Sequence, residues 1–431
     1  MVFIAYKEPT NFLYLAANFF NMELKKDKYT IQGLDLTKVA SEFGTPVYVY
    51  DADKIKNQYE HIISSFPGVD LQIKYAMKAL SNISIVKYMK ILGAGLDAVS
   101  IQEVQLGLSV GYEPKEIIFT PSCVDFAEIE EAISLGVTIN IDNIAILEQF
   151  GHKYGSKIPV CIRLNPHIMA GGNNKISTGH IDSKFGISIF QSRHLLRVLE
   201  TYNIHVNGLH MHTGSDLLDA EVFLKGAEIL FDFAKNFDTI EFLDFGSGFK
   251  VPYREGDIMV DLQDLGGKIS KAFIEFQKEY GRPVQLWFEP GKYLVSEAGV
   301  LLVKTNVVKT TPATVFVGVD SGMNHLIRPM MYDAFHDIVN ISNTNGTKRV
   351  YTIVGNICET DTFGWDRQLN EVKEGDILAI KNAGAYGYSM SSNYNSRFRP
   401  PEALIINSEA KLIRERETID VLRLGQVELD F

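Results

Sequence analysis

Short runs of β-forming residues recur along the chain from residue 71, and longer stretches with helical spacing separate them. In stretches such as NISIVKYMKILG (82–93), apolar residues recur at intervals of three and four, and a glycine ends the stretch as at a helix C-terminus. This alternation predicts eight strand–helix units, whose strands cover residues 71–78, 95–100, 116–121, 137–142, 160–166, 206–214, 242–248 and 286–291.

Eight such units over roughly 220 residues are typical of a (β/α)8 TIM barrel, which carries its active site at the carboxyl ends of the strands. A doubly wound open sheet is the alternative, but it rarely reaches eight units with every strand end polar or glycine-rich. The predicted strand ends carry Lys78, Asp97, Ser100, Asn165, His210, His212, Gly246 to Gly248 and Glu289 to Lys292. We therefore expect a barrel with its site at these ends.

After the eighth run the pattern changes to long alternating runs without helices. These runs, which include 299–310, 314–320, 349–355, 376–384, 402–407 and 410–419, predict a mainly antiparallel β domain. The run PVYVYD (46–51) precedes the first barrel unit and is expected to join that domain. The sequence thus predicts a barrel over 51–295 and a discontinuous β domain formed by 1–50 and 296–431.

Charge and composition exclude several classes of function for this protein. The net charge of -11 argues against a nucleic-acid partner, because such proteins usually carry basic patches, and favours a small-molecule substrate. The sequence has no apolar run of about 18 residues and no basic, apolar leader, so we expect a cytoplasmic protein without a membrane partner. Cys123, Cys161 and Cys358 form no CxxC pair, which disfavours disulfides and structural zinc.

Lys78 ends the first predicted barrel strand. A lysine at a strand end is often simply solvated, but a lysine whose neutral form is favoured by burial is the usual nucleophile for a carbonyl cofactor. The two-residue period of a strand places Lys74 on the same face, deeper in the barrel, where it would need a partner.

The sixth run ends in HMHTGS, and two histidines at this spacing could serve a metal. Such a site would need further ligands at later strand ends, where the sequence offers mainly GSG and EPG. We therefore predict no metal, and we expect His210 to be a packed core histidine.

Glycines follow the seventh and eighth runs, where barrels often bind phosphate through backbone amides. Glu289 at the same rim would be repelled by a phosphate and should face a cationic group, such as a protonated pyridine nitrogen. A lysine, a phosphate cradle, a carboxylate and a flat histidine together indicate pyridoxal 5'-phosphate.

Eight motifs spread over residues 75–387 extend this interpretation: YAMK, DAVS, HMHTGS, GSGF, FEPGK, RPMMYDAFH, NICETD and NAGAYG. In this order they resemble the fold type III pyridoxal-phosphate-dependent decarboxylases, which join an alanine-racemase-like barrel to a β domain. Among these, the chain is most similar to the diaminopimelate decarboxylases. The resemblance implies decarboxylation of meso-2,6-diaminopimelate to L-lysine and CO2.

The resemblance also implies roles for the cofactor site. Lys78 would bind the cofactor covalently, His212 would stack on its ring, and Glu289 would pair with the ring nitrogen. Asp97 would lie at the cofactor. The phosphate would be held by Ser215, Gly246, Ser247, Gly248, Gly291 and Tyr386.

For the substrate, the resemblance implies a homodimer with shared sites. Cys358 and Glu359 would enter from the partner subunit, Cys358 as proton donor and Glu359 as ligand of the distal ammonium. The distal carboxylate would be held by Lys292, Arg328 and Tyr332, with Tyr386 also near the substrate. The family usually has arginine where Lys292 stands, and an ammonium cannot make the bidentate contact of a guanidinium.

Two alternatives stay open at this point. A sibling decarboxylase could act on ornithine, lysine, arginine or carboxynorspermidine, where the distal group of most of these substrates prefers acids to cations. A non-catalytic cofactor-binding protein would need only the barrel, and the NICETD motif with the β domain speaks against it.

Overall fold

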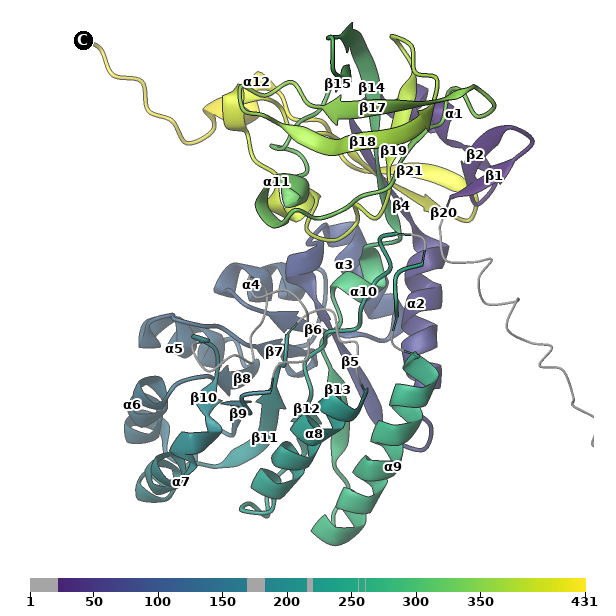
Figure 1. Cartoon of the computed structure of the whole chain (residues 1–431). Coiled ribbons are helices and arrows are strands. Elements are labelled where there is room, and N and C mark those ends of the chain that lie inside the picture. The colour runs from purple at the N-terminus through teal and green to yellow at the C-terminus, as the bar shows by residue number, and fades with distance from the viewer. Residues whose placement is uncertain (1–21, 169–182, 215–219, 255, 260) are drawn as a thin grey trace, which may run out of the picture.

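The computed structural model describes residues 22–168, 183–214, 220–254, 256–259 and 261–431. The described chain forms two units, a barrel surrounded by helices and a β unit that stands over one end of it (Figure 1). Both predicted units of the fold are confirmed, whereas the division at residues 51 and 296 stays a prediction.

Eight parallel strands close the barrel. They pair in chain order and the last pairs with the first. Their bounds are β5 (Leu71–Ala76), β6 (Gly95–Ala98), β7 (Ile117–Phe119), β8 (Thr138–Ile141), β9 (Val160–Asn165), β11 (Val206–Met211), β12 (Phe242–Asp244) and β13 (Gln285–Phe288). A short strand, β10 (Ile187–Ser188), adds to β9 outside the closed barrel.

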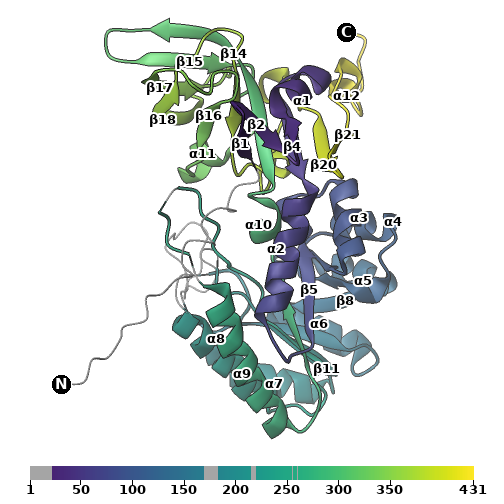
Figure 2. The same cartoon turned by 90° about the vertical axis from the view of Figure 1, so that its right-hand side faces the viewer.

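Helices cover the outside of the barrel, as Figure 2 shows from the side. Several begin at a side chain that accepts a backbone N–H, such as Asn82, Ser100 and Asn143. The helices are α2 (Ala52–Ser65), α3 (Ile83–Leu92), α4 (Ile101–Ser109), α5 (Phe126–Ser134), α6 (Ile144–Tyr154), α7 (Ser192–Thr201), α8 (Ala220–Ala234) and α9 (Leu262–Tyr280). A short helix, α10 (Lys292–Val295), lies at the end of the barrel that faces the β unit (Figure 1).

Side chains fill the barrel below the site. Phe242 and Trp287 stack with their ring centroids 3.7 Å apart, and the Lys74 ammonium lies 4.0 Å from the Trp287 ring centre. Lys74 also donates to the Glu116 carbonyl at 3.2 Å, so it has the partner that its buried position requires. Burial lowers the pKa of Lys74 to about 8.

The β unit is a mixed, mainly antiparallel sheet. In it β4 lies between β14 and β20, antiparallel to the first and parallel to the second. Its strands are β4 (Val47–Asp51), β14 (Gly299–Thr310), β15 (Val315–Val319), β16 (Ile338–Asn340), β17 (Lys348–Val354), β18 (Thr362–Asn370), β19 (Ile377–Ile380), β20 (Glu402–Ile406) and β21 (Glu409–Arg414). Smaller elements are β1 (Glu23–Lys25), β2 (Lys28–Ile31), β3 (Leu34–Asp35), α1 (Leu36–Phe43), α11 (Arg328–Tyr332) and α12 (Ile419–Arg423).

A buried carboxylate joins the two units. Glu402 on β20 is fully buried and accepts hydrogen bonds from Tyr50 and from Asn82, the residue that begins α3 of the barrel. These bonds fix the β unit above the carboxyl ends of the barrel strands. No helix in the described part of the chain is long and apolar enough to cross a membrane.

Candidate active site

A cavity lies at the carboxyl ends of the barrel strands, where the sequence predicts the site. Its wall comes from the ends of β5, β7, β9, β11, β12 and β13 and from the β unit. The residues that line it are Ala76, Lys78, Thr120, Arg163, His212, Ser247, Gly248, Phe249, Glu289, Gly291, Lys292, Tyr293 and Tyr386. The structure thus brings together most of the residues predicted for the cofactor.

Lys78 was predicted at the end of a strand, but it lies in a short turn that directly follows that strand. The chain leaves β5 at Ala76 and forms a 3-10 turn, Met77–Ala79, and this turn is tied to the β unit by the Tyr386 amide, which donates to the Ala79 carbonyl at 2.8 Å. The Lys78 ammonium reaches Asp97 on β6, with 3.1 Å between Nζ and Oδ2. Two neighbouring elements therefore aim this lysine into the cavity.

The charge state of Lys78 depends on its neighbour Asp97. Burial alone would lower its pKa, but the negative charge of the fully buried Asp97 outweighs that effect and the pKa is raised. The raised pKa favours the ammonium form of Lys78 when Asp97 is ionised. Burial and the charge of Glu289 in turn raise the pKa of Asp97 to about 7.

His212 is held by the glycine-rich turn after β12. The Ser247 amide donates to His212 Nδ1 at 3.1 Å, and burial together with Arg163 lowers the pKa of His212 to about 3. The ring is therefore neutral, with its proton on Nε2. Gly246 has a φ of 61°, and a Cβ there would lie 2.6 Å from His212 Nδ1. The turn thus positions a ring as well as offering backbone amides, and the Ser247 amide is already directed at His212.

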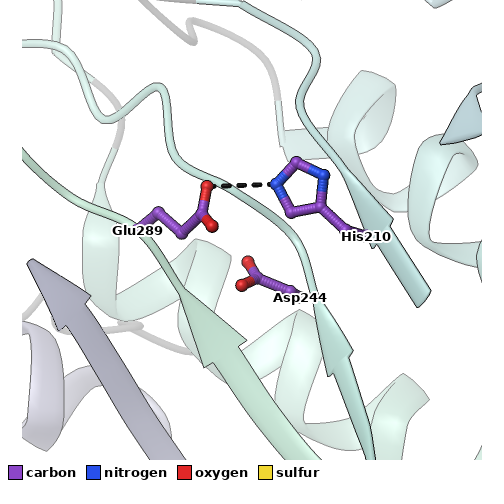
Figure 3. Close-up of side chains that lie close together, drawn as sticks. All are labelled: His210, Asp244 and Glu289. Atoms are coloured by element: carbon purple, nitrogen blue, oxygen red, sulfur yellow. Dashed lines mark hydrogen bonds and ion pairs between the residues drawn. The ribbon is translucent and has the colours of Figure 1, made fainter. Parts of the chain in front are cut away.

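Glu289 is buried at the end of β13 and points at His210 (Figure 3). Its Oε2 lies 3.0 Å from His210 Nε2, while its Oε1 has no hydrogen-bond partner among the described residues. Burial raises the pKa of Glu289, but the interaction with His210 and the positive charges of Lys78 and Arg163 outweigh burial, so the pKa is lowered. The result is an ionised carboxylate, in a residue that lines the cavity, with one oxygen that has no donor among the described residues. Such a carboxylate fits a protonated pyridine nitrogen.

The two histidines of HMHTGS do not fall in one group of potential metal ligands among the described residues. In the described part of the chain, ligand-type atoms within 4.8 Å of one another come together at His210, Asp244 and Glu289, without His212. His210 is a buried core histidine as expected, but its hydrogen bond to Glu289 was not foreseen.

Two predicted substrate ligands, Arg328 and Tyr332, are not among the residues that line this cavity. Arg328 begins α11, is buried, and donates to the Tyr253 hydroxyl at 2.6 Å with its guanidinium 5.0 Å from that ring. Tyr332 ends α11 and is half-buried. Neither lines the cavity around Lys78, whereas Lys292 does.

Cys358 and Glu359 are exposed on the β unit and do not line this cavity either. The Cys358 amide donates to Asn395 Oδ1 at 3.1 Å, and Glu359 accepts from the Tyr394 hydroxyl at 2.8 Å. The segment that carries them is fixed from beneath by the buried Asp361, which accepts the Ile357 amide at 3.0 Å. Ser215 lies outside the described residues.

The sequence reasoning missed Arg163. This residue is buried, lines the cavity from β9, and has its guanidinium 5.0 Å from the Phe185 ring. The strand period could have found it, since Arg163 shares a face with Asn165, which was recognised as a polar strand end. Thr120 after β7 was also missed, and its run offered no comparable signal.

Comparisons with known proteins agree with this geometry. The family model described as "Pyridoxal-dependent decarboxylase, pyridoxal binding domain" matches residues 52–296. A curated diaminopimelate decarboxylase of Methanothermobacter thermautotrophicus is 36% identical over 93% of this chain and 96% of its own.

Two solved structures are similar over nearly their whole length. Diaminopimelate decarboxylase from M. jannaschii in complex with L-lysine has a TM-score of 0.85 and 34% identity, covering 95% of this chain and 98% of that one. The Helicobacter pylori enzyme with L-lysine has a TM-score of 0.81 and 32% identity, covering 90% and 98%. The chain therefore belongs to the pyridoxal-dependent decarboxylases and, within them, to the diaminopimelate decarboxylase family.

Proposed function

We propose that this enzyme binds pyridoxal 5'-phosphate and decarboxylates meso-2,6-diaminopimelate to L-lysine and CO2. The observation that carries the proposal is the cavity that Lys78, Glu289 and Tyr386 line together, in which Glu289 keeps one oxygen without a donor among the described residues. The similarity to diaminopimelate decarboxylases over more than nine-tenths of the chain supports the substrate, and ornithine, lysine, arginine and carboxynorspermidine become the alternatives to test.

Each cavity residue has a task in this proposal. Lys78 would hold the cofactor through its aldehyde, and the neutral ring of His212 would pack against the cofactor. Glu289 would keep the ring nitrogen protonated, because its lowered pKa keeps the carboxylate ionised at neutral pH. When bound, the cofactor supplies an electron sink for the pair released as CO2 departs.

The phosphate is assigned to the glycine-lined side of the cavity. Gly248, Gly291 and Tyr386 all line the cavity, and the two glycines have no side chain to occupy it. Ser215, Gly246 and Ser247 complete the predicted set. The Ser247 amide already donates to His212, so it can bind the phosphate only through a bifurcated hydrogen bond that includes both acceptors.

Substrate recognition is proposed to need two subunits. Cys358 and Glu359 are exposed and far enough from their own cavity not to line it, which supports their entry into the site of a partner in a homodimer. There Cys358 would return a proton after CO2 leaves, and Glu359 would bind the distal ammonium. Lys292, Arg328 and Tyr332 would hold the distal carboxylate.

The test is CO2 release measured in parallel with meso-diaminopimelate, ornithine, lysine, arginine and carboxynorspermidine. We expect turnover of meso-diaminopimelate alone, with L-lysine as product. Preferred turnover of another substrate would refute the proposed specificity. Borohydride should fix the cofactor to Lys78 in the wild type and not in Lys78→Ala, and a fixed cofactor in the variant would refute the role of Lys78. A cytoplasmic location and the lack of a nucleic-acid partner stay predictions.

A further inference from the structure

His210, Asp244 and Glu289 lie on three neighbouring barrel strands and face the same interior layer. In the parallel register His210 on β11 is the partner of Asp244 on β12, and Asp244 is the partner of Trp287 on β13. Glu289 follows Trp287 by two residues, so the strand period turns it to the same side. Figure 3 shows the three side chains pointing toward one another.

The hydrogen bonds of this group leave two oxygens without a donor. Glu289 Oε2 faces His210 Nε2 at 3.0 Å, and Asp244 Oδ1 accepts the Gly246 amide at 2.8 Å. The remaining oxygens, Asp244 Oδ2 and Glu289 Oε1, are buried and have no partner among the described residues. Two buried carboxylates with one bare oxygen each repel one another strongly, and a proton shared between them removes that penalty.

We propose that Asp244 is a neutral carboxylic acid and that Asp244 and His210 are positioning residues for Glu289. His210 donates from Nε2 to one oxygen of Glu289, and Asp244 donates its proton toward the other. A carboxylate oxygen has two lone pairs, so Glu289 Oε1 can take this bond and still face a cofactor ring nitrogen. The group then carries a single negative charge, and it lies on Glu289. This inference rests on the proposed function at one point only, which is that the cationic group facing Glu289 is the ring nitrogen of the cofactor.

The electrostatics of the surroundings agree with this assignment. Burial and the charge of Glu289 raise the pKa of Asp244 well above its usual range, and hydrogen bonding to Glu289 adds to the effect. Burial lowers the pKa of His210, so the imidazole is neutral, and its bare Nδ1 is the unprotonated nitrogen of that tautomer. Among the nearby charges, the cations Lys78 and Arg163 favour an ionised Glu289. The Lys74 ammonium acts on both carboxylates, whereas Asp97 disfavours a negative charge on Asp244.

The first experiment uses the apoprotein and needs neither cofactor nor substrate. Infrared spectra at pH 9 with ¹³C-labelled aspartate should show the carbonyl band of a protonated acid, and Asp244→Asn should remove it. Nitrogen NMR of the wild type should show His210 protonated at Nε2 alone. Absence of the acid band in the wild type, or an imidazolium at His210, would overturn the proposal even if a variant fails to fold.

The second experiment compares substitutions through cofactor affinity and absorbance. Asp244→Ala should weaken cofactor binding by about tenfold or more, because it leaves Glu289 and the Gly246 amide without their partner. Asp244→Asn should restore it, since an amide mimics a neutral acid, and His210→Gln should outperform His210→Phe for the same reason. If Asp244→Asn is as defective as Asp244→Ala, then the charge of Asp244 is required and the proposal is wrong.

Two controls separate this inference from the function proposed above. Substrate turnover by the wild type tests the function alone, while the apoprotein spectra test the proton on Asp244 alone. Stoichiometric metal in the purified protein that Asp244→Asn releases would mean that the three residues are ligands, and would also overturn the proposal.

Discussion

Gly246→Ala is the substitution for which the structure gives the most detailed expectation. Gly246 has a φ of 61°, and a Cβ there would lie 2.6 Å from His212 Nδ1 and 2.8 Å from the Met211 carbonyl. Alanine in the left-handed region costs about 1–2 kcal/mol. The carbonyl belongs to a barrel strand and cannot retreat, so crowding adds about 1–3 kcal/mol and pushes the His212 ring away.

Gly281→Ala is the matched control. Gly281 ends α9 with a φ of 77°, but a Cβ there would meet no atom within 4 Å. The control therefore carries the backbone penalty without the crowding. Denaturant titrations of both apoproteins should show the larger destabilisation in Gly246→Ala, and only this variant should lose cofactor affinity, which absorbance titration measures. Equal midpoints and equal affinities would refute the role assigned to Gly246.

Three further predictions concern charge and assembly. Burial lowers the pKa of His336 to about 3, so the unfolded chain takes up the extra proton and stability should fall by about 2 kcal/mol between pH 6.5 and 5. His336→Gln should flatten this fall in urea titrations, and equal slopes would contradict it. Mixing Lys78→Ala with Cys358→Ala should restore about a quarter of the wild-type activity, because random exchange makes about half of the dimers heterodimers and each heterodimer has one intact site of two. No recovery would count against shared sites. Arg328→Gln should raise KM for meso-diaminopimelate about tenfold with less effect on kcat, and an unchanged KM would exclude a contact to the distal carboxylate.

The barrel could be predicted from the sequence because its signal is local. Each strand is a short β-rich run, and each run ends at a residue that water or a ligand must meet, such as Asp97 or Asn165. The 3-10 turn at Lys78 was not predictable in the same way, because YAMK reads as uninterrupted strand and the turn depends on a bond from Tyr386, more than 300 residues away.

The charge network below the site could not be predicted from the local sequence either. In the sequence nothing distinguishes His210 from other buried histidines, because its partner Glu289 comes from the distant strand end of β13. Asp244 likewise resembles a turn residue, and only the structure shows that its second oxygen lacks a donor among the described residues. Sequence patterns identify which residues reach the strand ends. They do not give the protonation states that three adjacent strands impose on one another.

The position of β4 has a consequence for the synthesis of the chain. Its partners are β14 and β20, so the second edge of VYVYD stays open until residue 405 has left the ribosome. The barrel strands follow β4 directly and can close long before that moment. Until then the nascent chain carries an apolar strand with an unpaired edge, at which it can pair with other chains.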